Sequence, residues 1–142
     1  MVRLIVIVKG PPDEQFWQPD TKALSQMLAY NEMLAKEGVL LAAEGLLGPS
    51  TTKRVRFDED EQTVLDGPHP EAKELVGGFW MLQVNSIDEG LEYVKKIPFG
   101  GGAEVEVRPV STFDDFGDAM TPKLREREER LAQMMKSANA NL

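Results

Sequence analysis

The sequence predicts an α+β fold, a ferredoxin-like sandwich with the order βαββαβ and a β-hairpin inserted at its centre. The apolar residues follow a strand period, then a helix period, then a strand period, and this order recurs after the hairpin. The stretches "LIVIV" and "VLLAA" are apolar at consecutive positions, which is typical of strands that are covered on both faces. We therefore expect a four-stranded antiparallel sheet with helices on one face and another apolar layer on the other.

The first half supplies a strand, a helix, a strand and the hairpin. A β-branched run at 3–9 stops at a glycine and two prolines, and a second apolar run covers 39–47. Between them, a helix is expected from Asp20 or Thr21 to Glu37. Its apolar stripe is Ala23, Met27, Tyr30 and Leu34, widened by Leu24 and Leu28. The runs "KRVRF" and "QTVL" flank an acidic tip at 58–61 and predict the hairpin.

The second half repeats the pattern and adds a tail. The run 77–84 predicts a strand, and Ser86 with Glu89 forms a capping box for a helix that carries Ile87, Leu91 and Val94. The run 103–110 alternates apolar and polar residues, as a strand does. Thr121 and Pro122 then begin a charged helix that should end near Lys136. We expect one domain over 1–112 and, over 113–142, a linker and helix packed on it or on its dimer partner.

Helices on one face leave the other apolar face of the sheet to be covered. The simplest cover is the same face of a second copy, because a two-fold interface uses one apolar patch twice. The sequence thus predicts a homodimer. Glu44, Glu104, Glu106 and Arg108 would then face a cavity between the two sheets.

Composition excludes several classes of partner. Sixteen basic and twenty-four acidic residues give a net charge of −8, which disfavours nucleic acid and anionic membrane surfaces. There is no cysteine and one histidine, so we expect no metal site and no cofactor. The apolar runs are shorter than a membrane span or a secretory core, and the prediction is a cytoplasmic protein.

Five stretches carry a resemblance to a known family. "YNEMLAKEGVLLAAEGL", "RVRFD", "DGPHPEAKELVGGFWMLQV", "EVRPV" and "LREREERL" are similar, in that order, to the YCII-related group of DGPF-domain proteins. The resemblance implies a ferredoxin-like fold of the dimeric α/β-barrel type. It implies no settled activity; related members have been proposed as enzymes because a histidine and an aspartate lie near a pocket, and many occur near sigma-factor genes. Here "DGPH" replaces the usual "DGPF", so His69 inherits no role.

Asp66 and His69 are the candidate catalytic residues. The aspartate could orient the imidazole as a general base, since imidazole titrates near neutrality. The alternatives are structural: Asp66, Gly67 and Pro68 have the chemistry of a turn, and His69 could pack as the family's aromatic does.

The candidate ligand-binding residues are spread over the chain. Glu44 is an acid in an apolar strand, so it should either reach a wet cavity or pair with Arg54, Arg56 or Arg108. Lys73 could hold an anionic group or form a surface pair with Glu74. The predicted binding set is Glu44, Arg54, Lys73, Trp80, Glu106 and Arg108.

Three functions fit these observations. The first is a small-molecule-binding homodimer with a sensory role or a role accessory to transcription. The second is a small cofactor-free enzyme that uses aspartate, histidine or glutamate as acid or base. The third is an interaction protein whose charged C-terminal helix contacts a partner.

Overall fold

The computed structural model describes residues 1–140, which divide into two compact units, 1–110 and the segment that begins at Ser111. The first unit contains six strands and two helices. They are β1 (Val2–Gly10), α1 (Thr21–Lys36), β2 (Leu40–Gly45), β3 (Lys53–Phe57), β4 (Gln62–Asp66), β5 (Leu75–Val84), α2 (Ile87–Val94) and β6 (Glu104–Pro109). Short 3-10 helices occupy Glu14–Trp17 and Pro49–Thr51. The second unit contains a 3-10 helix, Phe113–Ala119, and α3 (Pro122–Asn139).

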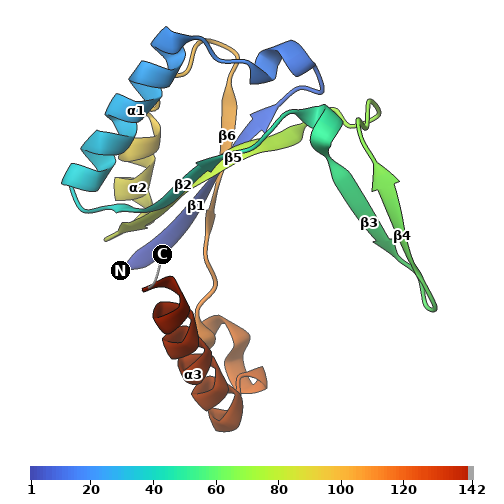
Figure 1. Ribbon diagram of the computed structural model, residues 1–142. Helices are drawn as coiled ribbons and strands as arrows, with labels where there is room; N and C mark the ends of the chain where they lie inside the picture. Colours follow the sequence, from blue (N-terminus) through green and yellow to red (C-terminus); the bar gives the residue numbers. More distant parts are fainter. Residues whose placement is uncertain (141–142) are drawn as a thin grey trace. The chain divides into compact units, whose positions relative to one another are not determined.

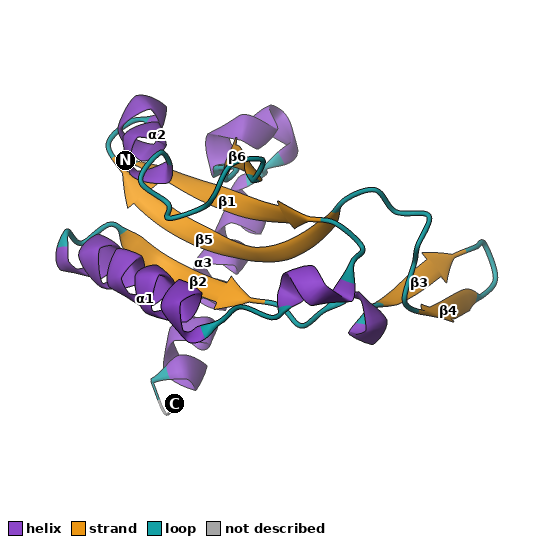
Figure 2. Ribbon diagram, turned by 90° about the horizontal axis from the view of Figure 1, so that it is seen from above, coloured by secondary structure: helices purple, strands orange, loops and turns teal. Residues whose placement is uncertain are grey.

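The main sheet has the strand order β2-β5-β1-β6, and each neighbouring pair is antiparallel. The first and third main strands are therefore central, and the second and fourth are at the edges, as in a ferredoxin-like sandwich. Helices α1 and α2 lie on the same face of this sheet (Figure 1). Viewed from above, the hairpin β3–β4 stands apart as a second, two-stranded sheet (Figure 2). The predicted fold class and the inserted hairpin are confirmed.

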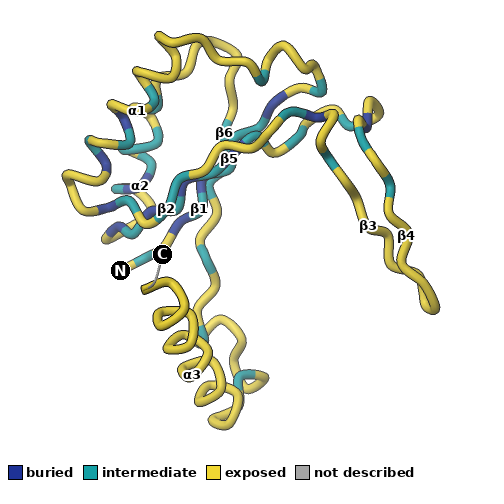
Figure 3. The backbone as a smooth tube through the Cα atoms, in the orientation of Figure 1, coloured by how far each residue is buried: buried dark blue, intermediate teal, exposed yellow. Residues whose placement is uncertain are grey.

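The core lies between the four-stranded sheet and the two helices. Burial alternates along β1 and β5, and the dark segments of the tube follow this alternation (Figure 3). The residues that form the core are Leu4, Val6, Tyr30, Leu34, Val39, Trp80, Leu82 and Val84. The helix α1 contributes only Tyr30 and Leu34 as fully buried side chains.

Two details of the sequence prediction are wrong. Leu24 and Leu28 do not widen the buried stripe of α1: they are 57% and 59% exposed, because α1 packs on the sheet through one narrow stripe and these residues lie beside it. The expected bounds of two strands also differ from the structure: β2 ends at Gly45 and not at 47, and β5 begins at Leu75 and not at 77. Leu75 pairs with Gly10 beyond a bulge at Val8 and Lys9.

The opposite face of the sheet, here called the second face, has an apolar centre and charged ends. The register pairs Ile5 with Met81 and Ile7 with Phe79, and all four side chains are half-buried. Glu104, Glu106 and Arg108 lie on this face because they pair with Lys9, Ile7 and Ile5. Ala42 and Glu44 join it from β2, opposite Met81 and Phe79. The prediction that the polar residues of the last strand share one face is confirmed.

The unit that begins at Ser111 is held together locally. The Thr112 N–H and hydroxyl donate to Asp115 Oδ2, and these bonds lower the pKa of the Asp115 carboxyl. Thr121 Oγ1 accepts from Leu124 N, so the predicted N-cap is confirmed, whereas α3 continues to Asn139, beyond the predicted end at Lys136. The Arg125 guanidinium lies 4.9 Å from the Phe113 ring centroid. The predicted packing of this segment on the domain or on a partner stays a prediction.

Candidate functional site

The base of the hairpin brings Asp66, His69 and Arg54 into one region. Asp66 Oδ1 accepts a hydrogen bond from Lys53 Nζ at 2.6 Å, across the two strands that the hairpin joins. This contact holds the pKa of the Asp66 carboxyl below its usual value, with a smaller effect from His69. Arg54 Nη1 donates to Glu71 Oε1 at 2.9 Å. The carboxylate of Asp66 therefore pairs with a lysine instead of capping the turn, which corrects the expected turn chemistry.

His69 is buried, with 7% of its surface exposed. Its Nδ1 lies 3.8 Å from Glu71 Oε1, and its Nε2 has no hydrogen-bond partner among residues 1–140. The charged contact of the imidazole is thus Glu71 and not the expected Asp66. Within the described chain, this is the one buried side-chain polar atom without a partner, which makes it the feature of the loop that needs explanation.

The sheet-end hollow is a second candidate site, which the sequence pattern does not predict. We use this name for a hollow of about 810 Å³ at the end of β1, between the segment 11–19 and the loop 99–104. The Trp17 side chain forms one wall of the hollow. Gly10 and Gly77 make room for its ring, because a Cβ on either glycine would collide with it. Trp17 Nε1 donates to the Pro11 carbonyl at 3.0 Å, which orients the indole. Phe16 and Phe99 complete the aromatic lining.

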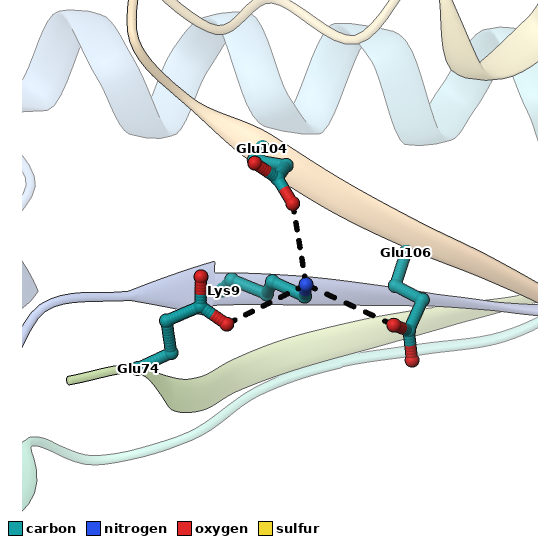
Figure 4. Close-up of polar contacts among 4 residues, drawn as sticks. All are labelled: Lys9, Glu74, Glu104 and Glu106. Atoms are coloured by element: carbon teal, nitrogen blue, oxygen red, sulfur yellow. Dashed lines mark hydrogen bonds and ion pairs between the residues drawn. The ribbon is translucent and has the colours of Figure 1, made fainter. Parts of the chain in front are cut away.

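Lys9 lies at the border between the sheet-end hollow and the second face, surrounded by three glutamates (Figure 4). Its Nζ lies 3.2 Å from Glu104 Oε1, 3.5 Å from Glu74 Oε2 and 3.7 Å from Glu106 Oε1. The hydrogen bond to Glu104 is the main reason why the pKa of Lys9 is raised. Lys9, Glu74 and Glu104 line the hollow, as does Lys73 from the predicted set.

A smaller cavity of about 220 Å³ adjoins the sheet-end hollow, since both are lined by Val8, Gly45, Gly77 and Phe99. Two predicted residues, Glu44 and Trp80, line it. Trp80 is a core residue whose Nε1 donates to Asn31 Oδ1 at 2.7 Å, and its ring meets Tyr30 edge-on. Of the two alternatives expected for Glu44, the ion pair is wrong: Glu44 is exposed, and within residues 1–140 it forms no ion pair with Arg54, Arg56 or Arg108. It lines the cavity instead.

The predicted binding set is therefore divided among four places. Lys73 lines the sheet-end hollow, Glu44 and Trp80 line the smaller cavity, Glu106 and Arg108 lie on the second face, and Arg54 lies at the base of the hairpin. The residues that were missed are Lys9, Phe16, Trp17 and Phe99. A lysine that ends an apolar strand was the available signal for Lys9. The aromatic pair at Phe16 and Trp17 gave no periodic pattern, because it lies in an irregular segment.

Two further features concern metal and membrane. Over residues 1–140, the chain brings together no group of three or more histidine, aspartate or glutamate side chains that could hold a metal ion. None of the helices in that range has the length and apolar character needed to cross a membrane.

The fold and these sites define a ferredoxin-like α+β domain with a helical extension. The model of the YCII-related domain matches residues 1–114. The chain belongs to the YCII-related family. It is similar to an uncharacterized protein of Rhizobium meliloti (strain 1021), at 24% identity over 98 residues, which cover 68% of this chain and 79% of that protein.

Proposed function

We propose that this chain is a cytoplasmic homodimer that binds a small molecule, with a sensory role or a role accessory to transcription. The second face would form the dimer interface, and the sheet-end hollow would hold the ligand. The observation that carries the proposal is the position of Lys9 and its glutamates where the hollow meets the second face.

The apolar centre of the second face supports a dimer. Ile5, Ile7, Phe79 and Met81 form a continuous patch over the two central strands. Helices α1 and α2 lie on the other face, so these side chains need a cover from elsewhere. A second copy supplies it without any new sequence, since a two-fold interface is self-complementary.

The charges on the second face favour an antiparallel two-fold arrangement. Arg3 and Arg108 lie toward the start of β1, and within the described part of the chain neither has an acidic partner. Glu104 and Glu106 lie toward the other end of β1. A two-fold axis that lies between the two sheets, parallel to their planes and perpendicular to the strands, places the basic end of one copy over the acidic end of its partner, which favours this pairing over a parallel one.

A charge-reversal cycle tests the dimer. Arg108→Glu should place like charges together across the interface. Sedimentation velocity at micromolar concentration should then show a smaller fraction of dimer and a larger fraction of monomer. Glu106→Arg should do the same, and the double variant should recover the dimer, because opposite charges are restored. A monomeric wild-type protein would overturn the proposed interface, as would a double variant that dissociates more than either single variant.

The shape and lining of the sheet-end hollow support ligand binding. A volume of about 810 Å³ is within the range of small-molecule sites, and an aromatic wall with a few charged groups is their usual composition. Trp17 offers a direct probe, because the chain contains only two tryptophans and each indole N–H gives one NMR signal. Aromatic fragments should shift the Trp17 signal, assigned by its loss in Trp17→Phe, and should leave the Trp80 signal in place. A fragment series that shifts neither signal would overturn the proposed site.

A second candidate function is acid–base catalysis at the hairpin base. The observation that favours it is the buried, unpartnered Nε2 of His69. His69→Phe restores the usual family residue and removes the imidazole, while ligand binding at the sheet-end hollow should survive. If the wild-type protein turns over a substrate and His69→Phe retains that activity, His69 is not the base.

A further inference from the structure

We infer that the hairpin β3–β4 is an arm that packs against the partner copy and completes the dimer interface. The name arm is used for residues 53–66. The inference rests on the proposed homodimer and adds a second contact surface to it. It is drawn from an exposed apolar face on the hairpin and from the direction in which the hairpin leaves the sheet.

One face of the arm is apolar and open to solvent. Val55 pairs with Val64 across the two strands, and Phe57 lies two residues beyond Val55, so the three side chains share this face. Their exposed fractions are 50% for Val55, 60% for Val64 and 74% for Phe57. Lys53 and Asp66, which pair with each other, end the face at the base of the arm. Exposed apolar groups gathered on one face mark a contact surface.

The arm has no core of its own. Every strand residue in it except Leu65 is exposed, and its two strands form a sheet separate from the main one. A two-stranded hairpin alone is at best marginally stable in water, and packing against another surface is what normally stabilises it. The arm therefore needs a contact that residues 1–110 do not supply.

The direction and length of the arm favour a second copy as that contact. In Figure 1 the arm leaves the end of β2 and points away from α1 and α2, on the side of the second face. Two sheets packed face to face lie about 10 Å apart, and five strand residues extend about 17 Å, so the arm is long enough to pass the partner's sheet. A partner on the second face would thus lie directly beside the arm.

The area of the second face also calls for a further contact. The edge strands β2 and β6 have six residues each. Four strands about 4.8 Å apart and about 20 Å long cover a flat area of roughly 400 Å². A stable interface buries about 800 Å² on each partner. The arm adds to the area, and a two-fold axis adds its contribution twice.

The two-fold axis proposed above also fixes where the arm contacts the partner. The arm starts beside the end of β2, and Gly45 at that end pairs with Gly78, which also pairs with Val8 near the end of β1. The axis places the start of the partner's β1 over this end of the sheet. We therefore expect the arm to pack beside the start of the partner's β1.

The first test measures the dimer dissociation constant of the full chain by sedimentation. Phe57→Ser should raise this constant about ten-fold or more, because buried aromatic residues carry much of an interface's binding energy. Val64→Thr keeps the shape of the side chain and should raise it less. The matched control is Phe116→Ser, which removes a 50% exposed phenylalanine outside the arm and should leave the constant unchanged. An equal effect of Phe57→Ser and Phe116→Ser would overturn the inference.

The second test locates the arm in the dimer, and the absence of cysteine makes it direct. A nitroxide label on Glu59→Cys, at the tip of the arm, is mixed with an unlabelled, ¹⁵N-enriched chain, so that any broadening of amide signals arises between copies. We expect broadening around Arg3 at the start of β1. The control label on Glu92→Cys lies on α2, on the other face of the sheet, and should not broaden these signals.

The outcomes separate the arm from the dimer itself. A monomeric wild-type protein would overturn the proposed dimer and the inference with it. A dimer whose dissociation constant is the same in Phe57→Ser, Val64→Thr and the wild type would overturn the arm contact and leave the second-face dimer. Broadening confined to residues 111–140 would assign the arm to the C-terminal segment and would also overturn the contact inferred here.

Discussion

Gly67 shows how one residue shapes the candidate loop. Its N–H donates to the Thr52 carbonyl at 2.6 Å, and a Cβ at this position would lie 2.7 Å from that oxygen and 2.8 Å from the Pro49 oxygen. Glycine is required here because the backbones approach closely, and not because of a positive φ: among residues 1–140, only Gly38, Gly102 and Gly117 have positive φ.

Gly67→Val should therefore destabilise the chain by about 2 kcal/mol or more, because neither carbonyl can move away without losing its own contacts. The free energy of unfolding from urea titration measures the loss. Gly101→Ala is the control: a Cβ there meets nothing within 4 Å. Equal stability of Gly67→Val and the wild type would show that the loop does not need this approach.

Tyr30 makes stability depend on pH in the alkaline range. Burial raises its pKa from 10.0 to about 12, and its hydroxyl donates to the Tyr93 carbonyl at 2.8 Å. Between those two pKa values the unfolded chain loses the phenolic proton and the folded chain keeps it. Stability should accordingly be complete below pH 10 and decline as the pH rises toward 12.

The tyrosine absorbance at alkaline pH measures this titration. The chain has two tyrosines, and the pKa of Tyr93 is also raised, chiefly by its hydrogen bond to Glu37. In Tyr93→Phe, the remaining signal should belong to Tyr30 and titrate near pH 12 in the folded protein. A midpoint near pH 10 would contradict the burial of its hydroxyl.

At the scale of elements, one glycine lets α2 approach the sheet closely. A Cβ on Gly90 would collide with Leu4 Cδ1, and Leu4 is fully buried in the core, so its side chain has no room to move aside. The hydroxyl of Ser86 accepts from Glu89 N and the carboxylate of Glu89 accepts from Asn85 N, so the start of α2 is also set by local bonds.

Gly90→Ala should destabilise the chain, although alanine is favoured in an isolated helix by about 1 kcal/mol. Overpacking against Leu4 costs about 1–3 kcal/mol, which exceeds that gain. Thermal unfolding measures the difference, and the double variant with Leu4→Val should recover part of the loss because the smaller side chain relieves the collision. A more stable Gly90→Ala would mean that α2 shifts away from β1 at no cost.

At the scale of the whole molecule, the two units differ in what holds them together. All eight buried core residues belong to 1–110, whereas α3 buries no residue. A chain that ends at Val110 should unfold cooperatively with the same midpoint as the full chain, measured by circular dichroism, because its core is complete. If that shorter chain does not fold, the segment 111–142 must supply part of the core.

The same truncation separates two of the predicted functions. Sedimentation of residues 1–110 should still show the dimer if the second face forms the interface. If the shorter chain still dimerises and still binds ligands in the sheet-end hollow, any role of α3 is limited to contact with a separate partner. Loss of the dimer with an intact fold would assign the interface to the C-terminal segment.

The sequence by itself determined the order of elements, the ferredoxin-like class and the caps at Ser86 and Thr121, because periodicity and capping are local patterns. The resemblance of five stretches to the YCII-related group indicated the family. Only the tertiary structure decided which candidate residues meet. It paired Asp66 with Lys53 and His69 with Glu71, and it joined Lys9 to Glu74, which lies far along the sequence. Such pairs depend on strand register and on a bulge after Val8, which shift side chains between faces and leave no periodic trace in the sequence.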